Sequence, residues 1–104
     1  MREKILAAVR SIPRGKVSTY GAIGRAAGLA HGARQVASNL RNSFNLPWHR
    51  VLGAGGEIKL RGDSAAEQRF RLQAEGVTFR GRRVNMKQHE FQFGKTKTSA
   101  RRNR

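Results

Sequence analysis

The sequence predicts a small α+β domain in which helices dominate. Before about residue 43, apolar residues recur at helical spacing in three separate segments. After that point, short apolar segments flank glycines, a pattern typical of hairpins, and one more amphipathic segment follows. With 104 residues, the chain has room for one modest core and therefore for a single domain.

The first predicted helix covers residues 3–12 and ends at Pro13-Arg14-Gly15. Its buried stripe consists of Ile5, Leu6, Val9 and Ile12. A second helix extends to Ala27, and either Ser18 or Thr19 caps its start by accepting a backbone hydrogen bond. Gly28 supplies the left-handed residue that ends it.

The third predicted helix spans residues 32–42 and has two distinct faces. The buried face comprises Ala33, Val36, Ala37 and Leu40. The outer face carries Arg34, Gln35, Ser38, Asn39 and Arg41. Two helices joined by a glycine-containing turn, the second with a polar outer face, are typical of a helix-turn-helix. We therefore expect Gln35, Ser38, Asn39 and Arg41 to contact DNA.

The second half predicts a wing beside these helices. Residues 46–52 and 57–60 flank a glycine-rich turn and favour a hairpin. A fourth helix at 64–75 has Ser64 and Glu67 at capping-box spacing, apolar Phe70 and Leu72, and Gly76 as its stop. Residues 77–79 and 84–86 favour a last small hairpin. The expected fold is a winged-helix-like helix-turn-helix domain with a short β-hairpin wing.

The charge indicates the class of partner. Lysine and arginine number 22 against 6 acidic residues, a formal net charge of +16. Such self-repulsion is costly unless a polyanion neutralises it, so nucleic acid is the expected partner. A merely solvated basic surface is one alternative. An anionic membrane is another, but it calls for bulky apolar residues opposite the basic ones on a helix, whereas these apolar residues occupy core positions.

The absence of cysteine excludes several kinds of chemistry. Disulfides, thiolate nucleophiles and Cys-type zinc sites are ruled out. His31, His49 and His89 lack the spacing of metal ligands, so we expect no metal and no cofactor. The chain shows neither a signal-peptide pattern nor an apolar run long enough to span a membrane. We expect a cytoplasmic monomer, associated with the nucleoid if the source is bacterial.

Four blocks of this sequence resemble the DNA-binding domain of the O6-alkylguanine-DNA alkyltransferases. They occur in the family's order, at residues 12–21, 33–36, 47–51 and 75–76. The likeness covers about residues 1–87. Residues 88–104 are left as a basic tail that we expect to be disordered, because it lacks an apolar pattern.

One departure from that family concerns its reactive residue. The alkyltransferases carry Pro-Cys-His-Arg, whereas this chain has Pro47-Trp48-His49-Arg50. It is thereby similar to the alkyltransferase-like proteins, which bind the same lesions without catalysis and recruit nucleotide excision repair. The resemblance implies binding of O6-alkylguanine in duplex DNA by nucleotide flipping, with no catalytic residue. His49 and Glu75 correspond to a vestigial activator network for a nucleophile that is missing.

The resemblance also assigns roles in lesion binding to four side chains. Arg34 fills the gap left by the flipped base, Tyr20 pushes on the adjacent phosphate, Arg61 lies beside the base, and Trp48 stacks on it. Three of these side chains, and also His49, have plainer alternatives. Arg34 and Arg61 could contact phosphates only, Tyr20 could be a half-buried core ring, and His49 a structural histidine that bonds backbone.

Rival functions remain open on sequence alone. A helix-turn-helix transcription regulator or a general DNA-binding protein would have the same fold and charge. An enzyme that uses Ser43 or Ser64 as its nucleophile is a further alternative, although neither serine lies in the Pro47-Trp48-His49-Arg50 block.

Overall fold

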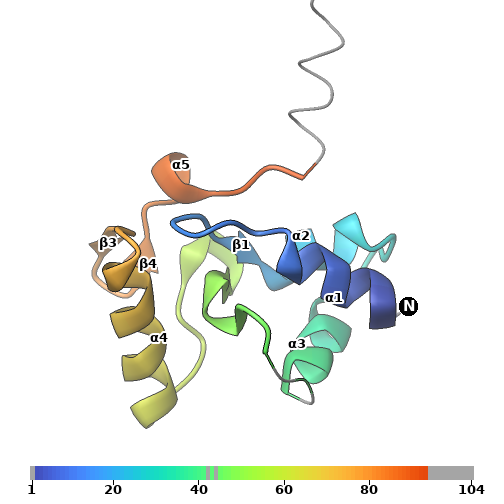
Figure 1. Ribbon diagram of the computed structural model, residues 1–104, viewed down its shortest axis with the longest axis horizontal. Coiled ribbons are helices and arrows are strands. Elements are labelled where there is room, and N and C mark those ends of the chain that lie inside the picture. The colour runs from blue at the N-terminus through green and yellow to red at the C-terminus, as the bar shows by residue number, and fades with distance from the viewer. Residues whose placement is uncertain (1, 42, 44, 94–104) are drawn as a thin grey trace, which may run out of the picture.

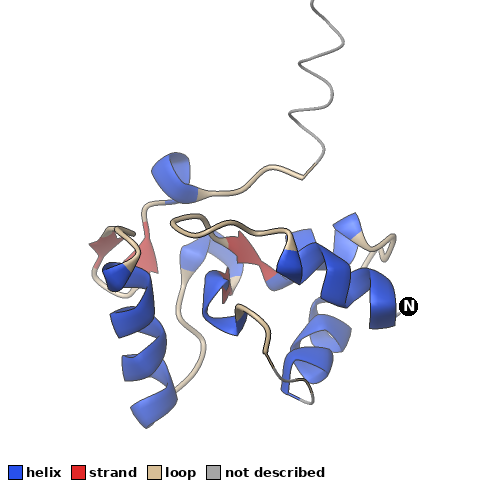
Figure 2. Cartoon of the chain, in the orientation of Figure 1, coloured by secondary structure: helices blue, strands red, loops and turns tan. Residues whose placement is uncertain are grey.

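The computed structural model describes residues 2–41, 43 and 45–93. Helices make up most of this part, and its strands form two short pairs (Figure 2), which confirms the predicted fold class. The elements in order are α1 (Arg2–Arg10), β1 (Ser18–Thr19), α2 (Tyr20–Ala26), α3 (Ala33–Arg41), a 3₁₀ turn (Trp48–Arg50), β2 (Val51–Leu52), a second 3₁₀ turn (Ala54–Gly56), α4 (Gly62–Ala74), β3 (Phe79–Arg80), β4 (Arg83–Val84) and α5 (Met86–His89).

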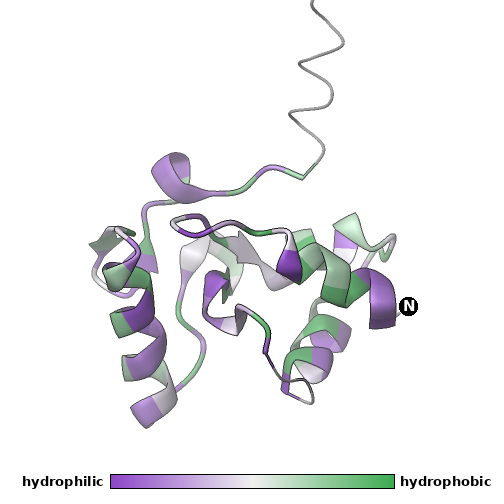
Figure 3. Cartoon of the chain, viewed as in Figure 1, coloured by the Kyte–Doolittle hydropathy of each residue, from purple (hydrophilic) through white to green (hydrophobic). Residues whose placement is uncertain are grey.

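Helices α1, α2 and α3 pack together at one end of the molecule, and α4 with the β3–β4 pair lies at the other (Figure 1). Along α1, the first turn is hydrophilic, the middle of the helix is hydrophobic, and the helix ends at the hydrophilic Arg10 (Figure 3). The first core lies among these three helices, and its buried residues are Ile5, Ala8, Val9, Ile12, Ile23, Ala27, Val36, Leu46 and Val51.

The helix-turn-helix forms as predicted, and Thr19 is its cap. The Thr19 hydroxyl accepts a hydrogen bond from the Ala22 N–H at 3.1 Å. After α2, Gly28 takes a left-handed φ of 91°, which only glycine adopts at low cost. The two helices cross closely, since a Cβ on Gly24 would lie 3.2 Å from the Cα of Gly32. A side chain at Gly24 would therefore push α3 away from α2.

The predicted buried face of α3 is only partly right. Val36 is fully buried, Ala37 and Leu40 are half-buried, but Ala33 is exposed. Ala33 faces an open cavity that it shares with Gly21 of α2 and the 53–55 turn, rather than the core. Helical periodicity predicted that Ala33 is buried, but the described segments that share this cavity leave it exposed.

The predicted hairpin between residues 46–52 and 57–60 is wrong. Val51 and Leu52 instead pair in parallel with Ser18 and Thr19, as β2 against β1. Gly53 donates a hydrogen bond of 2.8 Å to the Glu57 carbonyl, but this bond closes a turn and not a strand pair. Successive strand residues point to opposite faces, so Val51 enters the first core and Leu52 the second. Pairing with β1 buries both of these side chains.

The second core joins α4 to the β3–β4 hairpin, and its buried residues are Val17, Leu52, Ile58, Leu72, Val77 and Val84. The hairpin is the small one predicted near the C-terminus, with Phe79 opposite Val84. Helix α4 differs from prediction at its start. It begins at Gly62, so Ser64 lies inside its first turn and forms no capping box with Glu67.

The buried face of α4 also differs from prediction. Leu72 is fully buried, but Phe70 is 71% exposed, and the other buried residue of the helix is Gln68. Gly76 has a φ of 89° just after the helix, which confirms the predicted stop.

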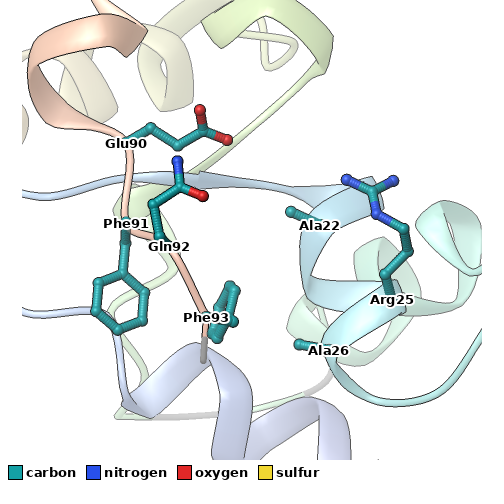
Figure 4. Close-up of a pocket in the computed structure, with 7 residues that line it drawn as sticks. All are labelled: Ala22, Arg25, Ala26, Glu90, Phe91, Gln92 and Phe93. Carbon is teal, nitrogen blue, oxygen red and sulfur yellow. The ribbon is translucent and has the colours of Figure 1, made fainter. Parts of the chain in front are cut away.

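The packed part of the chain extends past the boundary predicted at residue 87. The Val17 N–H donates to the His89 carbonyl at 2.9 Å, and the Phe91 N–H donates to the Val17 carbonyl at 2.8 Å. Phe91 and Phe93 meet edge to face, 5.0 Å between centroids, and pack against the first core. Figure 4 shows this segment facing α2 across a cavity of about 310 Å³. The rest of the predicted tail, residues 94–104, lies outside the described residues.

Candidate nucleic-acid interface

A surface pocket lies where the end of α3 faces the start of α4. We call it the Trp48 pocket; its volume is about 450 Å³, and it is lined by Tyr20, Leu40, Arg41, Ser43, Trp48, Leu60 and Ser64. The walls therefore combine two aromatic rings and two leucines with three hydrogen-bonding side chains. Such a mixture suits a flat aromatic ligand that carries polar edge groups.

Tyr20, the first residue of α2, contributes a half-buried ring to this pocket. Burial raises the pKa of its hydroxyl above the usual 10.0, and the positive charge of Arg41 opposes that rise. The hydroxyl is therefore neutral at physiological pH and remains able to donate a hydrogen bond.

Trp48 is the first residue of the 3₁₀ turn that leads into β2. Its indole is half-buried and meets the His49 ring edge to face, with centroids 6.1 Å apart. The Arg71 guanidinium of α4 lies over the indole, 5.6 Å from the ring centroid. The turn thus presents Trp48 to the pocket and directs the next residue, His49, into the interior.

Behind the pocket lies a compact polar cluster, the Glu75 network, made of Gly15, His49, Arg50 and Glu75. One Glu75 oxygen lies 2.7 Å from His49 Nε2 and 2.8 Å from Arg50 Nη2. The other accepts from the Gly15 N–H and from Arg50 Nε, both at 3.0 Å. Arg50 also donates to the Ile12 carbonyl at 2.9 Å. The network therefore ties the loop after α1 to the 3₁₀ turn and to the end of α4.

This network keeps Glu75 ionised. Burial by itself raises the pKa of the carboxyl group, but the hydrogen bonds from Arg50, His49 and the Gly15 N–H outweigh it and lower the pKa to about 2. The two residues predicted as a vestigial activator network, His49 and Glu75, are thus in direct contact. The Arg50 guanidinium and the Gly15 N–H complete the cluster around the Glu75 carboxylate.

A second supporting residue, Gln68 of α4, was missed entirely. Its side chain is 1% exposed, and its amide donates to the carbonyls of His49 at 3.1 Å and of Val51 at 3.0 Å. These bonds fix the backbone on either side of Arg50. The available signal was a polar residue one helical turn before Leu72, on the face that had to be buried.

The other predicted DNA-contacting residues surround the pocket or lie away from it. Arg34 and Gln35 are exposed in the first turn of α3 and do not line the pocket, whereas Arg41 does. Ser38 is half-buried on the same helix. Arg61 is exposed directly before α4, next to the pocket-lining Leu60.

The side chain of Asn39 is hydrogen-bonded to other groups of the protein. Its side-chain oxygen accepts from Arg2 of α1 at 3.0 Å, and its amide donates to the Gln35 carbonyl at 2.8 Å. Ser43, which lines the pocket, donates to the Asn39 carbonyl at 2.7 Å and accepts from Arg2 at 3.1 Å. These bonds hold the end of α3 to the start of α1.

Within the described part of the chain, no three histidine, aspartate or glutamate side chains gather in a way that could hold a metal ion. In the same residues, no helix is both long enough and apolar enough to cross a membrane.

Residues 1–77 match the family model of the 6-O-methylguanine DNA methyltransferase DNA-binding domain. Two similar curated proteins are a DNA base-flipping protein of Vibrio parahaemolyticus and alkyltransferase-like protein 1 of Schizosaccharomyces pombe. The first is 43% identical over 77 residues, covering 71% of this chain and 77% of the relative. The second is 47% identical over 79 residues, covering 71% and 73%.

Solved structures are also similar to this chain. A crystal structure of S. pombe Atl1 in complex with damaged DNA containing O6-carboxymethylguanine superposes with a TM-score of 0.74 at 37% identity, covering 88% of this chain and 94% of that one. The Mycobacterium tuberculosis O6-methylguanine methyltransferase superposes with a TM-score of 0.62 at 28% identity, covering 71% and 47%.

Proposed function

Because the chain belongs to the family of the 6-O-methylguanine DNA methyltransferase DNA-binding domain, we propose that it is a non-enzymatic sensor of O6-alkylguanine in duplex DNA. In this proposal the damaged nucleotide leaves the base stack and enters the Trp48 pocket. The names of the relatives, a base-flipping protein and an alkyltransferase-like protein, support the proposal. So does the damaged DNA bound by S. pombe Atl1.

The observation that carries the proposal is Trp48 at the wall of a pocket with an intact Glu75 network behind it. By the family resemblance, a cysteine nucleophile would occupy this position. The indole has a broad apolar face and an N–H that can only donate, so it offers no electron pair suited to accept an alkyl group. Stacking on an aromatic side chain is worth about 1–3 kcal/mol per base, which offsets much of the cost of flipping.

We assign the remaining roles by the family resemblance, and the positions of the side chains are compatible with them. Tyr20, in the pocket wall, turns the adjacent phosphate, and exposed Arg34 enters the stack in place of the flipped base. Arg61, next to Leu60 at the pocket edge, approaches the base from the side. Around them, Gln35, Ser38 and Arg41 bind the DNA strand. Asn39 braces α3 through its bond with Arg2.

A competition assay between an O6-methylguanine duplex and its unmodified twin tests lesion recognition. We expect the monomeric protein to prefer the damaged duplex. Equal affinity for the two would favour a general DNA-binding protein. A preference set by sequence rather than by damage would favour a transcription regulator.

Intact-protein mass spectrometry tests the absence of alkyl transfer. After incubation with an O6-alkylguanine duplex, we expect the protein mass to stay unchanged, since the chain has no cysteine. A stable mass increase equal to the alkyl group would show that another side chain, such as Ser43 or Ser64, is a nucleophile.

We further propose that the bound complex serves as a signal for nucleotide excision repair. Flipping and groove insertion bend the duplex, so a small adduct becomes a large distorted protein–DNA object. In an incision assay with purified excision-repair proteins, adding this protein should increase incision of an O6-alkylguanine duplex, and Arg34→Ala should not. Reduced incision would instead mean that the protein merely shields the lesion.

A further inference from the structure

Helix α4 carries a pair of charged side chains next to the Trp48 pocket, and one of them, Arg71, contacts the indole ring. The Cζ atom of Arg71 lies 5.6 Å from the centroid of the indole ring of Trp48, within the range of a cation–π interaction. Arg71 is not among the residues that line the pocket, whereas Trp48 is. The guanidinium therefore touches the indole without occupying the space open to a ligand.

Glu67, one turn earlier on α4, holds Arg71 in this place. Both Nε and Nη2 of Arg71 donate to the same Glu67 oxygen, at 2.9 and 2.6 Å. Both hydrogen bonds end on one oxygen of an i,i+4 partner, and they restrain the guanidinium close to the Trp48 ring. The indole ring also packs edge to face against His49, whose own Nε2 is bound to Glu75.

From this geometry we propose that Arg71 is a positioning residue that orders the Trp48 indole for stacking on a flipped alkylguanine. The inference rests on the proposed function of the Trp48 pocket and adds a residue to it. A half-buried tryptophan that is free to change rotamer loses that freedom on binding a base, and the loss weakens binding. Arg71 and His49 restrain the ring beforehand, so less freedom remains to be lost.

The protein contains a single tryptophan, so fluorescence reports on Trp48 directly in the free protein. Removing the cation with Arg71→Gln should lower the steady-state anisotropy of Trp48 and increase its quenching by acrylamide. Arg71→Lys, which keeps a cation on a long side chain, should restore part of both signals. Arg10→Gln, at an exposed helix position of α1, removes one positive charge elsewhere and should leave both signals unchanged.

The same variants are compared for binding to O6-methylguanine duplex and to its unmodified twin. The preference for the damaged duplex should fall about two- to fivefold in Arg71→Gln, which corresponds to the energy of an exposed cation–π contact. The affinity of Arg71→Gln for the unmodified duplex should match that of Arg10→Gln. Arg71→Lys should recover part of the preference.

Three results would overturn this inference. Unchanged Trp48 fluorescence in Arg71→Gln would show that the arginine does not order the ring. A disordered ring with an unchanged preference would show that the ordering does not serve binding. An equal loss of affinity for both duplexes would make Arg71 a phosphate contact.

A failure of the proposed function would give a result that differs from these three. In that case the wild-type protein itself shows no preference for the damaged duplex. The role of Arg71 in lesion binding then fails with it, while the fluorescence of the free protein still decides whether Arg71 positions Trp48.

Discussion

The Trp48 pocket and the Glu75 network meet at three consecutive residues, Trp48, His49 and Arg50, and yet the two regions differ in almost every physical respect. In the network, the Glu75 side chain is 6% exposed, and both of its oxygens receive hydrogen bonds from protein groups. In the pocket, exposed and half-buried side chains surround about 450 Å³ of open space. Trp48 belongs to one region, and His49 and Arg50 belong to the other.

The difference shows which positions a family can change without losing its scaffold. Removing one partner from a buried ionised cluster leaves a charge without compensation, which is strongly destabilising. Replacing a side chain that borders open space leaves neither a cavity nor an unpaired charge. A tryptophan at position 48 can therefore change the wall of the pocket while the network continues to hold the fold.

The largest effect is expected from breaking the network. Glu75→Ala should lower the free energy of unfolding by about 3–5 kcal/mol, because Arg50 and His49 lose their common partner while they remain largely buried. Urea denaturation measures this change. Glu67→Ala is the control, since its ion pair with Arg71 is about half exposed and should contribute under ~1 kcal/mol. Equal losses in the two variants would contradict the comparison.

Acid should weaken the network before it affects the pocket. The pKa of Glu75 is lowered from 4.5 to about 2 in the folded protein. A carboxylate whose pKa is lower in the folded than in the unfolded state stabilises the fold fully above its unfolded pKa, and this contribution is lost as the pH falls through the folded value. The free energy of unfolding, measured by urea denaturation, should therefore fall as the pH is lowered from 4.5 to about 2. Glu75→Gln should show a shallower dependence there, and an equally steep one would assign the acid sensitivity to other groups.

Changing the pocket should have the opposite pattern of effects: a large change in lesion binding and a small change in stability. Trp48→Ala should reduce the preference for O6-methylguanine duplex by about 1–3 kcal/mol, the worth of stacking one base. The urea midpoint should change little, because the indole is only half-buried. Trp48→Phe, which keeps an aromatic face, should retain part of the preference. A large loss of stability in Trp48→Ala would mean that the pocket and the network are one unit.

Arg34 tests whether flipping needs a residue outside both regions. Its side chain is exposed and does not line the pocket, so Arg34→Ala should leave stability unchanged. We expect the free energy of lesion binding to weaken by about 1–2 kcal/mol, the lower half of the 1–3 kcal/mol range for one base-directed interaction. Fluorescence of 2-aminopurine at the lesion site should show less flipping. An unchanged signal would show that Arg34 is only a surface charge.

The smallest effect on selectivity is expected at the C-terminus. Residues 94–104 include Lys95, Lys97, Arg101, Arg102 and Arg104. Deleting them should flatten the plot of log affinity against log salt by about 0.9 for each phosphate that they neutralise, with the preference for damaged DNA unchanged. A collapsed preference would mean that these residues touch the lesion. Deletion from residue 88 should also lower stability, because it removes buried His89 and the Phe91 bond to Val17.

Several features could be predicted from the sequence because their causes are local. Thr19 caps α2 through a group three residues away, and Gly28 and Gly76 end helices through their own left-handed φ. The motif block at 47–51 placed Trp48 next to the candidate activator His49. The first turn of α4 marks the limit of such reasoning, since a capping-box spacing at Ser64 did not set the start of the helix.

The amino-acid sequence was therefore enough to predict the helix-turn-helix, the mostly helical class and the positive charge, and its family resemblance predicts that Trp48 stands where relatives carry a nucleophile. Three features depend on tertiary packing: β2 pairs with β1, Gln68 is buried while Phe70 is exposed, and residues 88–93 pack on the rest of the domain. Tertiary packing also brought Arg71 of α4 over Trp48 and gathered Gly15, His49 and Arg50 around the Glu75 carboxylate. These arrangements join residues that are mostly far apart in the sequence, and local periodicity cannot specify them because the partner that buries or binds each group lies on another element.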